Sequence, residues 1–191
     1  ALFNGLSASF AKGQISCIVG PNGCGKSTLA KLAMGLIKPA SGRVLIQGRN
    51  VASLNPRERA RRLGVLVQQQ EAPMMTVREL AACGRFPHHG PLSRLDETDA
   101  QCIDETLSLA GVYDLRDRPL RSLSGGQRQR ARMAMVLAQD TPVVLLDEPT
   151  SFMDAAACFD MMRLVRRVRE RGKTVIAVIH DLNLALSVAD A

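Results

Sequence analysis

The chain has 191 residues, of which 46% are hydrophobic and 23% charged, which is typical of a folded globular protein and excludes a disordered chain. Its longest apolar stretches, at 133–138 and 175–179, are far shorter than the roughly 20 residues that cross a bilayer. Lys and Arg outnumber Asp and Glu by 25 to 18, a net charge of +7 that favours anionic partners: nucleotide phosphates, nucleic acid or a membrane face. With five Phe, one Tyr and no Trp, the chain has few rings for base stacking, so we expect no nucleic-acid partner.

The cysteines, at positions 17, 24, 83, 102 and 158, include no Cys-x-x-Cys pair. The sequence therefore indicates neither a zinc ribbon nor a disulfide framework. A reducing, cytosolic setting fits best, and no charged-then-apolar leader opens the chain.

Predicted strands and helices alternate along the chain. The strands are expected at 14–19, 43–46, 63–67, 143–146 and 174–179, and the helices at 26–36, 96–110, 127–138 and 154–171. Strands that alternate with helices predict a parallel sheet covered by helices. The segment 69–123 has helical patterns but no convincing buried strand, so we expect it to be a helical insertion.

A glycine-rich loop lies between the first predicted strand and helix, and it fits G-x-x-x-x-G-K-[ST] from Gly20 to Ser27. Its glycines allow successive N–H groups to turn inward on an anion, and the positive end of the following helix adds to that field. Lys26 can reach the β- and γ-phosphates, and the hydroxyl of Ser27 suits Mg²⁺. The predicted phosphate site comprises Gly20, Pro21, Asn22, Gly23, Cys24, Gly25, Lys26, Ser27 and Thr28.

Two adjacent carboxylates, Asp147 and Glu148, follow the apolar run 143–146. Neighbours on a strand point in opposite directions, so Asp147 can face the water shell of a metal while Glu148 aims at an attacking water. The alternative is a solvated strand end, which the nearby phosphate loop disfavours. Because the Asn-Lys-x-Asp signature of guanine recognition is absent, a GTPase is disfavoured.

A second anion site is indicated by Leu123-Ser-Gly-Gly-Gln127. Ser124 is a good N-cap for the helix that follows, and Gly125 and Gly126 leave the first N–H groups of that helix bare. One nucleotide needs only one phosphate loop. The surplus helix end makes sense if it serves a nucleotide held by another copy of the chain.

With this motif the chain resembles the ATP-binding subunits of ABC transporters, whose signature is Leu-Ser-Gly-Gly-Gln, and the resemblance covers essentially all 191 residues. It matches Gln68 to the Q-loop, Asp147 and Glu148 to the Walker B carboxylates, Asp154 to the end of the D-loop, and His180 to the switch histidine. It implies an α/β P-loop NTPase fold with a mainly parallel, helix-covered sheet, a small antiparallel β part and an inserted helical subdomain.

The resemblance also implies a head-to-tail dimer that encloses two ATP molecules, each held by residues 20–28 of one copy and by Ser124, Gly126 and Gln127 of the other. Mg²⁺ would be held by Ser27, Gln68 and Asp147. The implied catalytic roles are phosphate binding by Lys26, polarisation of water by Glu148, contact with the γ-phosphate by His180, and metal sensing by Gln68.

The family pattern further implies a single domain that is trimmed at both ends, with a catalytic core at 1–68 and 124–191 and a helical subdomain at 69–123. Phe3 and Phe10 lie at positions where core residues belong, so the adenine-stacking aromatic is expected outside this chain. In the D-loop, Phe152 and Met153 replace the usual Ala-Leu pair, which bears on packing across the dimer and not on chemistry.

The stretches 75–80 and Gly84-Arg-Phe-Pro-His88 resemble importer ATPases for iron–siderophore complexes, haem and cobalamin. This implies a peripheral subunit at the cytoplasmic face of the inner membrane that powers a permease and, indirectly, serves a substrate-binding protein.

The segment 84–88 is either a permease-docking bend or a plain surface turn. A soluble ABC ATPase, for example one in iron–sulfur cluster assembly, is the alternative function. Arginine clusters at 57–62 and 163–171 are read as solvated helix faces, compatible with an anionic membrane leaflet.

Overall fold

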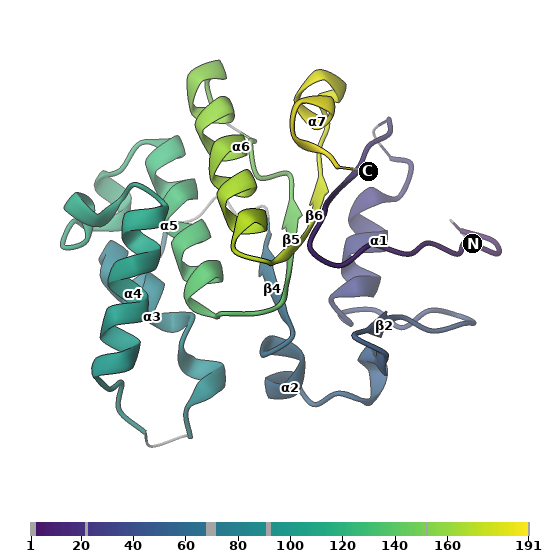
Figure 1. The fold of residues 1–191 in the computed structure, drawn as a ribbon, viewed down its shortest axis with the longest axis horizontal. Helices are drawn as coiled ribbons and strands as arrows, with labels where there is room; N and C mark the ends of the chain where they lie inside the picture. The colour runs from purple at the N-terminus through teal and green to yellow at the C-terminus, as the bar shows by residue number, and fades with distance from the viewer. Residues whose placement is uncertain (1–2, 22, 68–71, 91–92, 152, 191) are drawn as a thin grey trace.

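A central sheet of four parallel strands organises the chain, and the computed structural model describes residues 3–21, 23–67, 72–90, 93–151 and 153–190 (Figure 1). The order across the sheet is β1-β6-β5-β4. The strands are β1 (Ile15–Ile18), β4 (Leu63–Leu66), β5 (Val143–Asp147) and β6 (Thr174–Val178). Because all adjacent pairs run parallel, the loops that follow these strands meet at one edge of the sheet.

The helices confirm most of the expected pattern. They are α1 (Lys26–Ala33), α2 (Pro56–Ala60), α3 (Val77–Cys83), α4 (Glu97–Leu109), α5 (Gly125–Ala138), α6 (Ala155–Glu170) and α7 (Leu182–Val188). The helix predicted over 26–36 ends earlier, at Ala33, because Gly35 adopts a left-handed φ of 67°. Short 3-10 helices lie at Val51–Ser53, Phe86–His88, Tyr113–Leu115 and Leu120–Ser122.

The small antiparallel part is a two-stranded hairpin of β2 (Leu45–Ile46) and β3 (Arg49–Asn50). Strand β2 is shorter than the strand predicted at 43–46. The family fold class is confirmed: a mainly parallel sheet, a small antiparallel unit and abundant helix.

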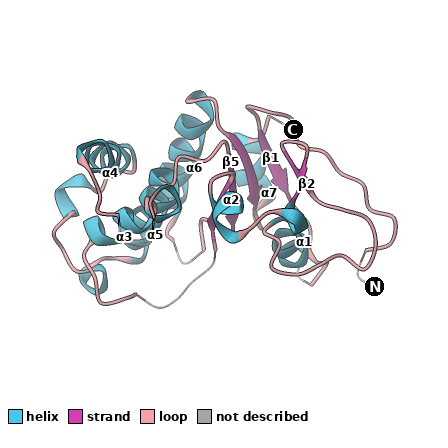
Figure 2. Cartoon of the chain, turned by 90° about the horizontal axis from the view of Figure 1, so that it is seen from below, coloured by secondary structure: helices cyan, strands magenta, loops and turns pink. Residues whose placement is uncertain are grey.

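Both faces of the central sheet are buried, which explains the unbroken apolar runs of its strands. On β5, Val144 and Leu146 belong to one hydrophobic cluster and Leu145 to the other. The first cluster includes residues of α3 to α7, and the second includes Ala30 of α1. Figures 1 and 2 show the result: α1 lies on one side of the central strands, and α5 lies on the other.

Helices α3 and α4 pack against α5, at the side of the molecule remote from α1 (Figure 2). The described residues between 72 and 123 contain helices and one isolated bridge, between Thr76 and Pro119, but no strand. The division into a catalytic core and a helical subdomain stays a prediction. Among the described helices, none combines the length and the apolar character needed to cross a membrane.

One core expectation is wrong. Phe10 is 38% exposed and Phe3 is only partly buried. Phe10 lies outside any strand or helix, so no element holds its ring against either cluster.

Candidate nucleotide-binding site

The phosphate loop joins β1 to α1, and its backbone takes conformations that favour glycine. Gly23 and Gly25 have φ values of 78° and 103°, and Gly25 is the N-cap of α1. The buried ammonium of Lys26 donates to the carbonyl oxygens of Gly20 at 2.7 Å and Pro21 at 2.9 Å. The loop thus wraps around its own cation at the start of a helix, where the N–H groups of the first turn have no intrahelical acceptor.

The remaining loop residues differ in exposure. Ser27 is exposed and Thr28 is half-buried. Cys24 is exposed, but its sulfur lies so close to Gly20 that a Cβ atom there would meet it at 2.9 Å. A larger residue than glycine at position 20 would therefore displace the thiol of Cys24. Asn22, also predicted to bind phosphate, lies outside the described residues.

Glu148 follows β5 directly and turns the backbone out of the strand. Its φ of 51° is left-handed, a conformation that is uncommon for a residue with a Cβ atom. Its N–H donates to the carbonyl oxygen of Val178 at the end of β6, at 3.0 Å. The hydroxyl of Ser151 donates to Oε2 of Glu148 at 2.9 Å. The left-handed turn and the hydrogen bond from Ser151 therefore fix the side chain of Glu148. The strand pattern predicted neither of them.

Asp147 is the last residue of β5, and its Oδ1 atom is buried without a hydrogen-bond partner among the described residues. Burial raises the pKa of this carboxyl, the negative charge of Glu148 raises it further, and Lys31 and Lys26 partly oppose the shift. A buried carboxylate oxygen with no donor is unfavourable alone, but it is a suitable ligand for a hydrated cation. The donor set of Asp147 and the exposed hydroxyl of Ser27 fits Mg²⁺; Gln68 lies outside the described residues.

A cavity of about 390 Å³ brings Glu148 and His180 together. It lies beside the first turns of α6 and α7, and its lining comprises Glu148, Thr150, Ser151, Ala155, Cys158, Phe159, His180, Asp181, Asn183 and Leu184. His180 is exposed, two residues after β6 ends at Val178. Asp181 caps α7 by accepting from the N–H of Asn183 at 2.8 Å. None of the described residues of the phosphate loop lines this cavity. The sequence did not predict the cavity, because no pattern in the chain links α6 to α7.

The D-loop leads from Glu148 into α6. Asp154 is the N-cap of α6 and accepts a hydrogen bond from the N–H of Ala157 at 2.8 Å. The N–H of Ser151 donates to the carbonyl oxygen of Glu148 at 3.2 Å. Phe152, the unusual D-loop residue, lies outside the described residues.

The signature residues begin α5, where Ser124 is the expected N-cap. The hydroxyl of Ser124 accepts from the N–H of Gln127 at 3.2 Å, and the side chain of Gln127 accepts from the N–H of Ser124 at 3.1 Å. Leu123 is buried, whereas Ser124 and Gly125 are exposed. A Cβ atom at Gly126 would lie 3.3 Å from Ala157 of α6, so this helix start lies against the D-loop helix.

The structure does not bring the signature to the phosphate loop of the same chain. Helices α1 and α5 start at the two loops in question, and Figures 1 and 2 place them on opposite sides of the central strands. The two helix starts that the sequence predicts to bind anions therefore lie apart in one chain. Glu148, His180 and the phosphate loop all follow parallel strands and share one sheet edge.

The segment 84–89 is more tightly integrated than either sequence interpretation suggested. The guanidinium of Arg85 pairs with Asp99 of α4 at 2.8 Å and donates to the carbonyl oxygen of Ala138, the last residue of α5, at 2.8 Å. Nε2 of His88 lies 2.8 Å from the carbonyl oxygen of Gln139, and Nε2 of His89 lies 2.7 Å from Asp99. This segment therefore joins α4 to α5, a structural role that the sequence did not reveal.

Comparison with known proteins identifies the family. The ABC transporter family profile matches residues 3–151. The achromobactin transport ATP-binding protein CbrD of Dickeya dadantii (strain 3937) is 44% identical over 191 residues, covering 99% of this chain and 71% of that protein. The iron(3+)-hydroxamate import ATP-binding protein FhuC of Bacillus subtilis (strain 168) is 41% identical over 182 residues, covering 94% and 68%. The dimeric structure of a bacterial ABC transporter cassette superposes with a TM-score of 0.84 at 30% identity, covering 97% and 82%.

A P-loop, a strand-end carboxylate pair and a capped signature helix on one parallel sheet define a nucleotide-binding ATPase. The chain belongs to the ABC transporter family, as an ATP-binding subunit with ATPase activity. The transporter interpretation is thereby confirmed over the soluble ABC ATPase that the sequence had left open.

Proposed function

We propose that two copies of the chain pair head to tail and enclose Mg²⁺-ATP between the phosphate loop of one copy and the signature of the other. The observation that carries this proposal is the position of α1 and α5 on opposite sides of the sheet (Figures 1 and 2). Two half-sites this far apart serve one triphosphate only when a second copy supplies the missing half. The dimeric arrangement of a related cassette supports the same conclusion.

Within this site, the residues of the chain divide into binding and orienting groups. Lys26 and the loop N–H groups bind the phosphates, while Ser27, Asp147 and Gln68 hold Mg²⁺. The ion, when bound, neutralises charge on the phosphate oxygens. Glu148 accepts a proton from the attacking water and orients it, and the bond from Ser151 keeps the carboxylate in one rotamer. His180 lines the same cavity as Glu148, and there it contacts the γ-phosphate.

The head-to-tail arrangement predicts that two inactive variants restore each other. Lys26→Ala removes the phosphate half-site, and Ser124→Arg blocks the signature half-site. A mixed pair then retains one intact composite site, made of Lys26 from one copy and Ser124 from the other. We expect ATP turnover to be absent in each variant alone and to reappear on mixing. Mixing Lys26→Ala with Glu148→Gln is the control, because both changes affect the same half-site. A mixture no more active than its components would overturn the head-to-tail pair.

We further propose that the ATPase powers import of a ferric chelate through a membrane permease, at the cytoplasmic face of the inner membrane, with a substrate-binding protein delivering the chelate. This proposal is supported by relatives whose names specify iron(3+)-hydroxamate import and achromobactin transport. Deletion of the coding gene should abolish uptake of radiolabelled ferric hydroxamate or a related ferric siderophore. The intact chain should restore uptake and Lys26→Ala should not. Unchanged uptake of every ferric chelate tested would contradict the transport proposal and leave the ATPase assignment intact.

A further inference from the structure

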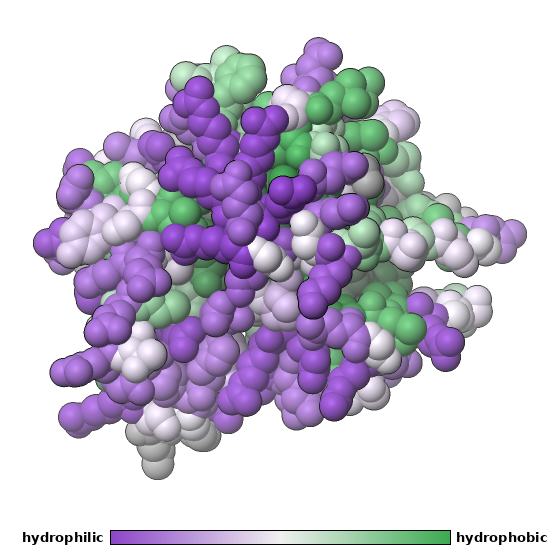
Figure 3. All heavy atoms as spheres, in the orientation of Figure 1, coloured by the Kyte–Doolittle hydropathy of each residue, from purple (hydrophilic) through white to green (hydrophobic). Residues whose placement is uncertain are grey.

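The two arginine clusters differ in how their charge is compensated. In the cluster at 163–171, Arg163 pairs with Asp160 at 3.3 Å, and Arg169 makes two 3.1 Å bonds to the carboxylate of Asp190. Figure 3 shows hydrophilic side chains gathered over α6, the helix that carries most of this cluster. Carboxylates therefore pair with two of the five arginines of this cluster, Arg163 and Arg169, while Arg166 donates to the carbonyl oxygen of Ser187.

The cluster at 57–62 has no such compensation. Its arginines bond to neutral oxygens: Arg57 to the carbonyl of His89 at 2.6 Å, and Arg61 to the carbonyl of Pro87 at 2.8 Å. None of the arginines at 57, 59, 61 and 62 forms an ion pair with any residue in the described part of the chain. The one acid in α2, Glu58, is engaged by the N–H of Asn55 at 3.0 Å.

These bonds also hold the positive charges in fixed positions. They fasten α2 to the 3-10 helix Phe86–His88, which α4 and α5 anchor from behind through Arg85 and His88. A guanidinium that gives one or two of its five donors to a carbonyl still presents the others outward. Arg57 and Arg61 remain exposed, so their remaining donors face solvent.

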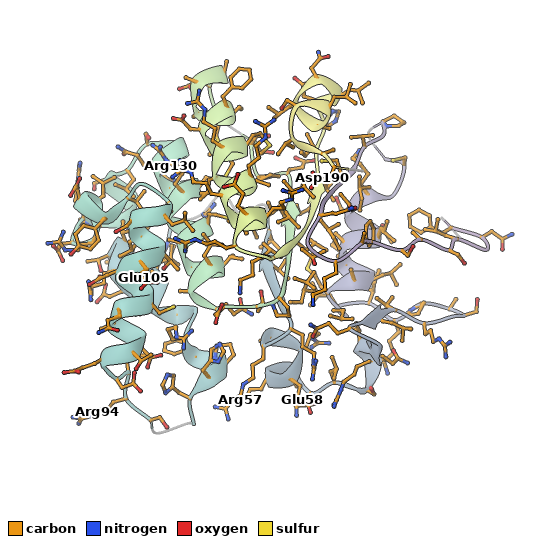
Figure 4. All side chains as sticks on the ribbon, in the orientation of Figure 1. Arg57, Glu58, Arg94, Glu105, Arg130 and Asp190 are labelled. Atoms are coloured by element: carbon orange, nitrogen blue, oxygen red, sulfur yellow. The ribbon has the colours of Figure 1, made fainter. Side chains whose placement is uncertain are left out.

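An aromatic ring and a third arginine complete this face. Phe86 is 61% exposed although its neighbours on both sides are held by hydrogen bonds. Arg94 is exposed, and Figure 4 shows it at the same lower edge of the molecule as Arg57. We call Arg57, Arg61, Phe86 and Arg94 the basic–aromatic face.

We propose that the basic–aromatic face binds the phosphate groups of anionic phospholipids directly, so that the subunit contacts the bilayer as well as its permease. Guanidinium groups recognise phosphate through parallel N–H bonds, and an exposed aromatic ring beside them suits the boundary between headgroups and acyl chains. The fixed arginines lose little freedom on binding. The proposal rests on the membrane location proposed above, but it needs neither ATP nor a permease.

The test is sedimentation of the intact chain with vesicles of phosphatidylglycerol and phosphatidylcholine, or of phosphatidylcholine alone. We expect binding to the anionic vesicles only, weakening as salt rises. The double change Arg57→Gln and Arg61→Gln should weaken binding roughly 25-fold, at about fivefold for each arginine near the surface. Arg163→Gln with Arg167→Gln removes the same charge from α6 and should leave binding within about twofold.

Further variants keep the test decisive if the loss of α2 bonds disturbs folding. Arg94→Gln, at a residue with no assigned bond, should weaken vesicle binding by about fivefold. Phe86→Ser should also weaken it without changing the melting temperature. Equal weakening by the α6 control, equal binding to phosphatidylcholine, or preferential binding to an oligonucleotide would overturn the proposal. If vesicle binding fails while the mixed variants still restore ATP turnover, only the lipid inference falls.

Discussion

Nε of Arg85 lies 2.8 Å from Oδ1 of Asp99, in an ion pair whose side chains are only 12% and 3% exposed. The other carboxylate oxygen of Asp99 accepts from the N–H of Asp96 at 3.0 Å and lies 2.7 Å from Nε2 of His89. Since Arg85 also donates to the end of α5, one buried carboxylate fixes the start of α4 against the end of the signature helix.

Asp99→Asn should therefore destabilise the chain by about 3 kcal/mol, because Arg85 is left buried without its counter-charge. Burial by itself would raise the pKa of Asp99, but the hydrogen bonds from Asp96 and Arg85, together with the adjacent ring of His89, outweigh it and hold that pKa well below its usual value. A lowered carboxyl pKa stabilises the fold above the unfolded-state value, near 3.9, and this contribution is lost as pH falls towards the folded-state value.

Thermal unfolding of wild type and Asp99→Asn at several pH values checks this. The difference in melting temperature should be largest near neutral pH and shrink below about pH 4. Asp104→Asn is the matched control, since the Arg78–Asp104 pair is far more exposed and should contribute about 1 kcal/mol or less. A pH-independent difference for Asp99→Asn would show that packing, not charge, is the cause.

Gly84→Ala should destabilise the chain by about 2 kcal/mol, measured by urea unfolding. A Cβ atom at Gly84 would lie 2.2 Å from the carbonyl oxygen of Met135, so α3 would have to move away from α5. Gly90→Ala is the control, because there the nearest obstacle is the rotatable hydroxyl of Ser93 at 3.1 Å. Similar losses in both variants would contradict close packing of α3 against α5 as the factor that governs position 84.

Asp147→Asn should make the chain more stable and less functional at once. The raised pKa of Asp147 and its unpartnered Oδ1 show that the charged form is costly in the folded state. Neutralising it should raise the melting temperature at pH 7 by roughly 2–4 °C, and the gain should disappear at acid pH, where the wild-type carboxyl is protonated. The same change should abolish the added stability that Mg²⁺ gives with ATP. A lower melting temperature at pH 7 would contradict this account.

Glu148→Gln should retain ATP binding, lower turnover by about 100-fold or more, and accumulate an ATP-bound pair of chains. Gln keeps the shape of the side chain and an acceptor for Ser151, so the left-handed turn is expected to persist. Gel filtration with ATP and a phosphate-release assay measure the two effects. Glu170→Gln, an exposed change at the far end of α6, controls for charge. Undiminished hydrolysis by Glu148→Gln would exclude Glu148 as the base.

Local motifs made much of this protein predictable from sequence. The helix that starts at Lys26, the strand predicted at 143–146, which runs one residue further to Asp147, and the cap at Ser124 depend on neighbouring residues, and each is confirmed. The structure adds features that depend on long-range packing. Asp99 looks like an ordinary first-turn acid of a helix, and only the approach of three helices buries it. The left-handed turn at Glu148 likewise depends on a bond to the neighbouring strand β6.

The central position of β6 has a consequence for watching the protein at work. All five of its residues are buried, and strands pair with it on both sides. Hydrogen–deuterium exchange at residues 174–178 should therefore require global unfolding, so it reports the stability of the whole chain. Amides of the exposed signature start exchange through local opening instead. The ratio of the exchange rate at the signature start to the exchange rate at residues 174–178 separates nucleotide-driven closure from a general stabilisation of the fold. Both rates come from a single mass-spectrometric run.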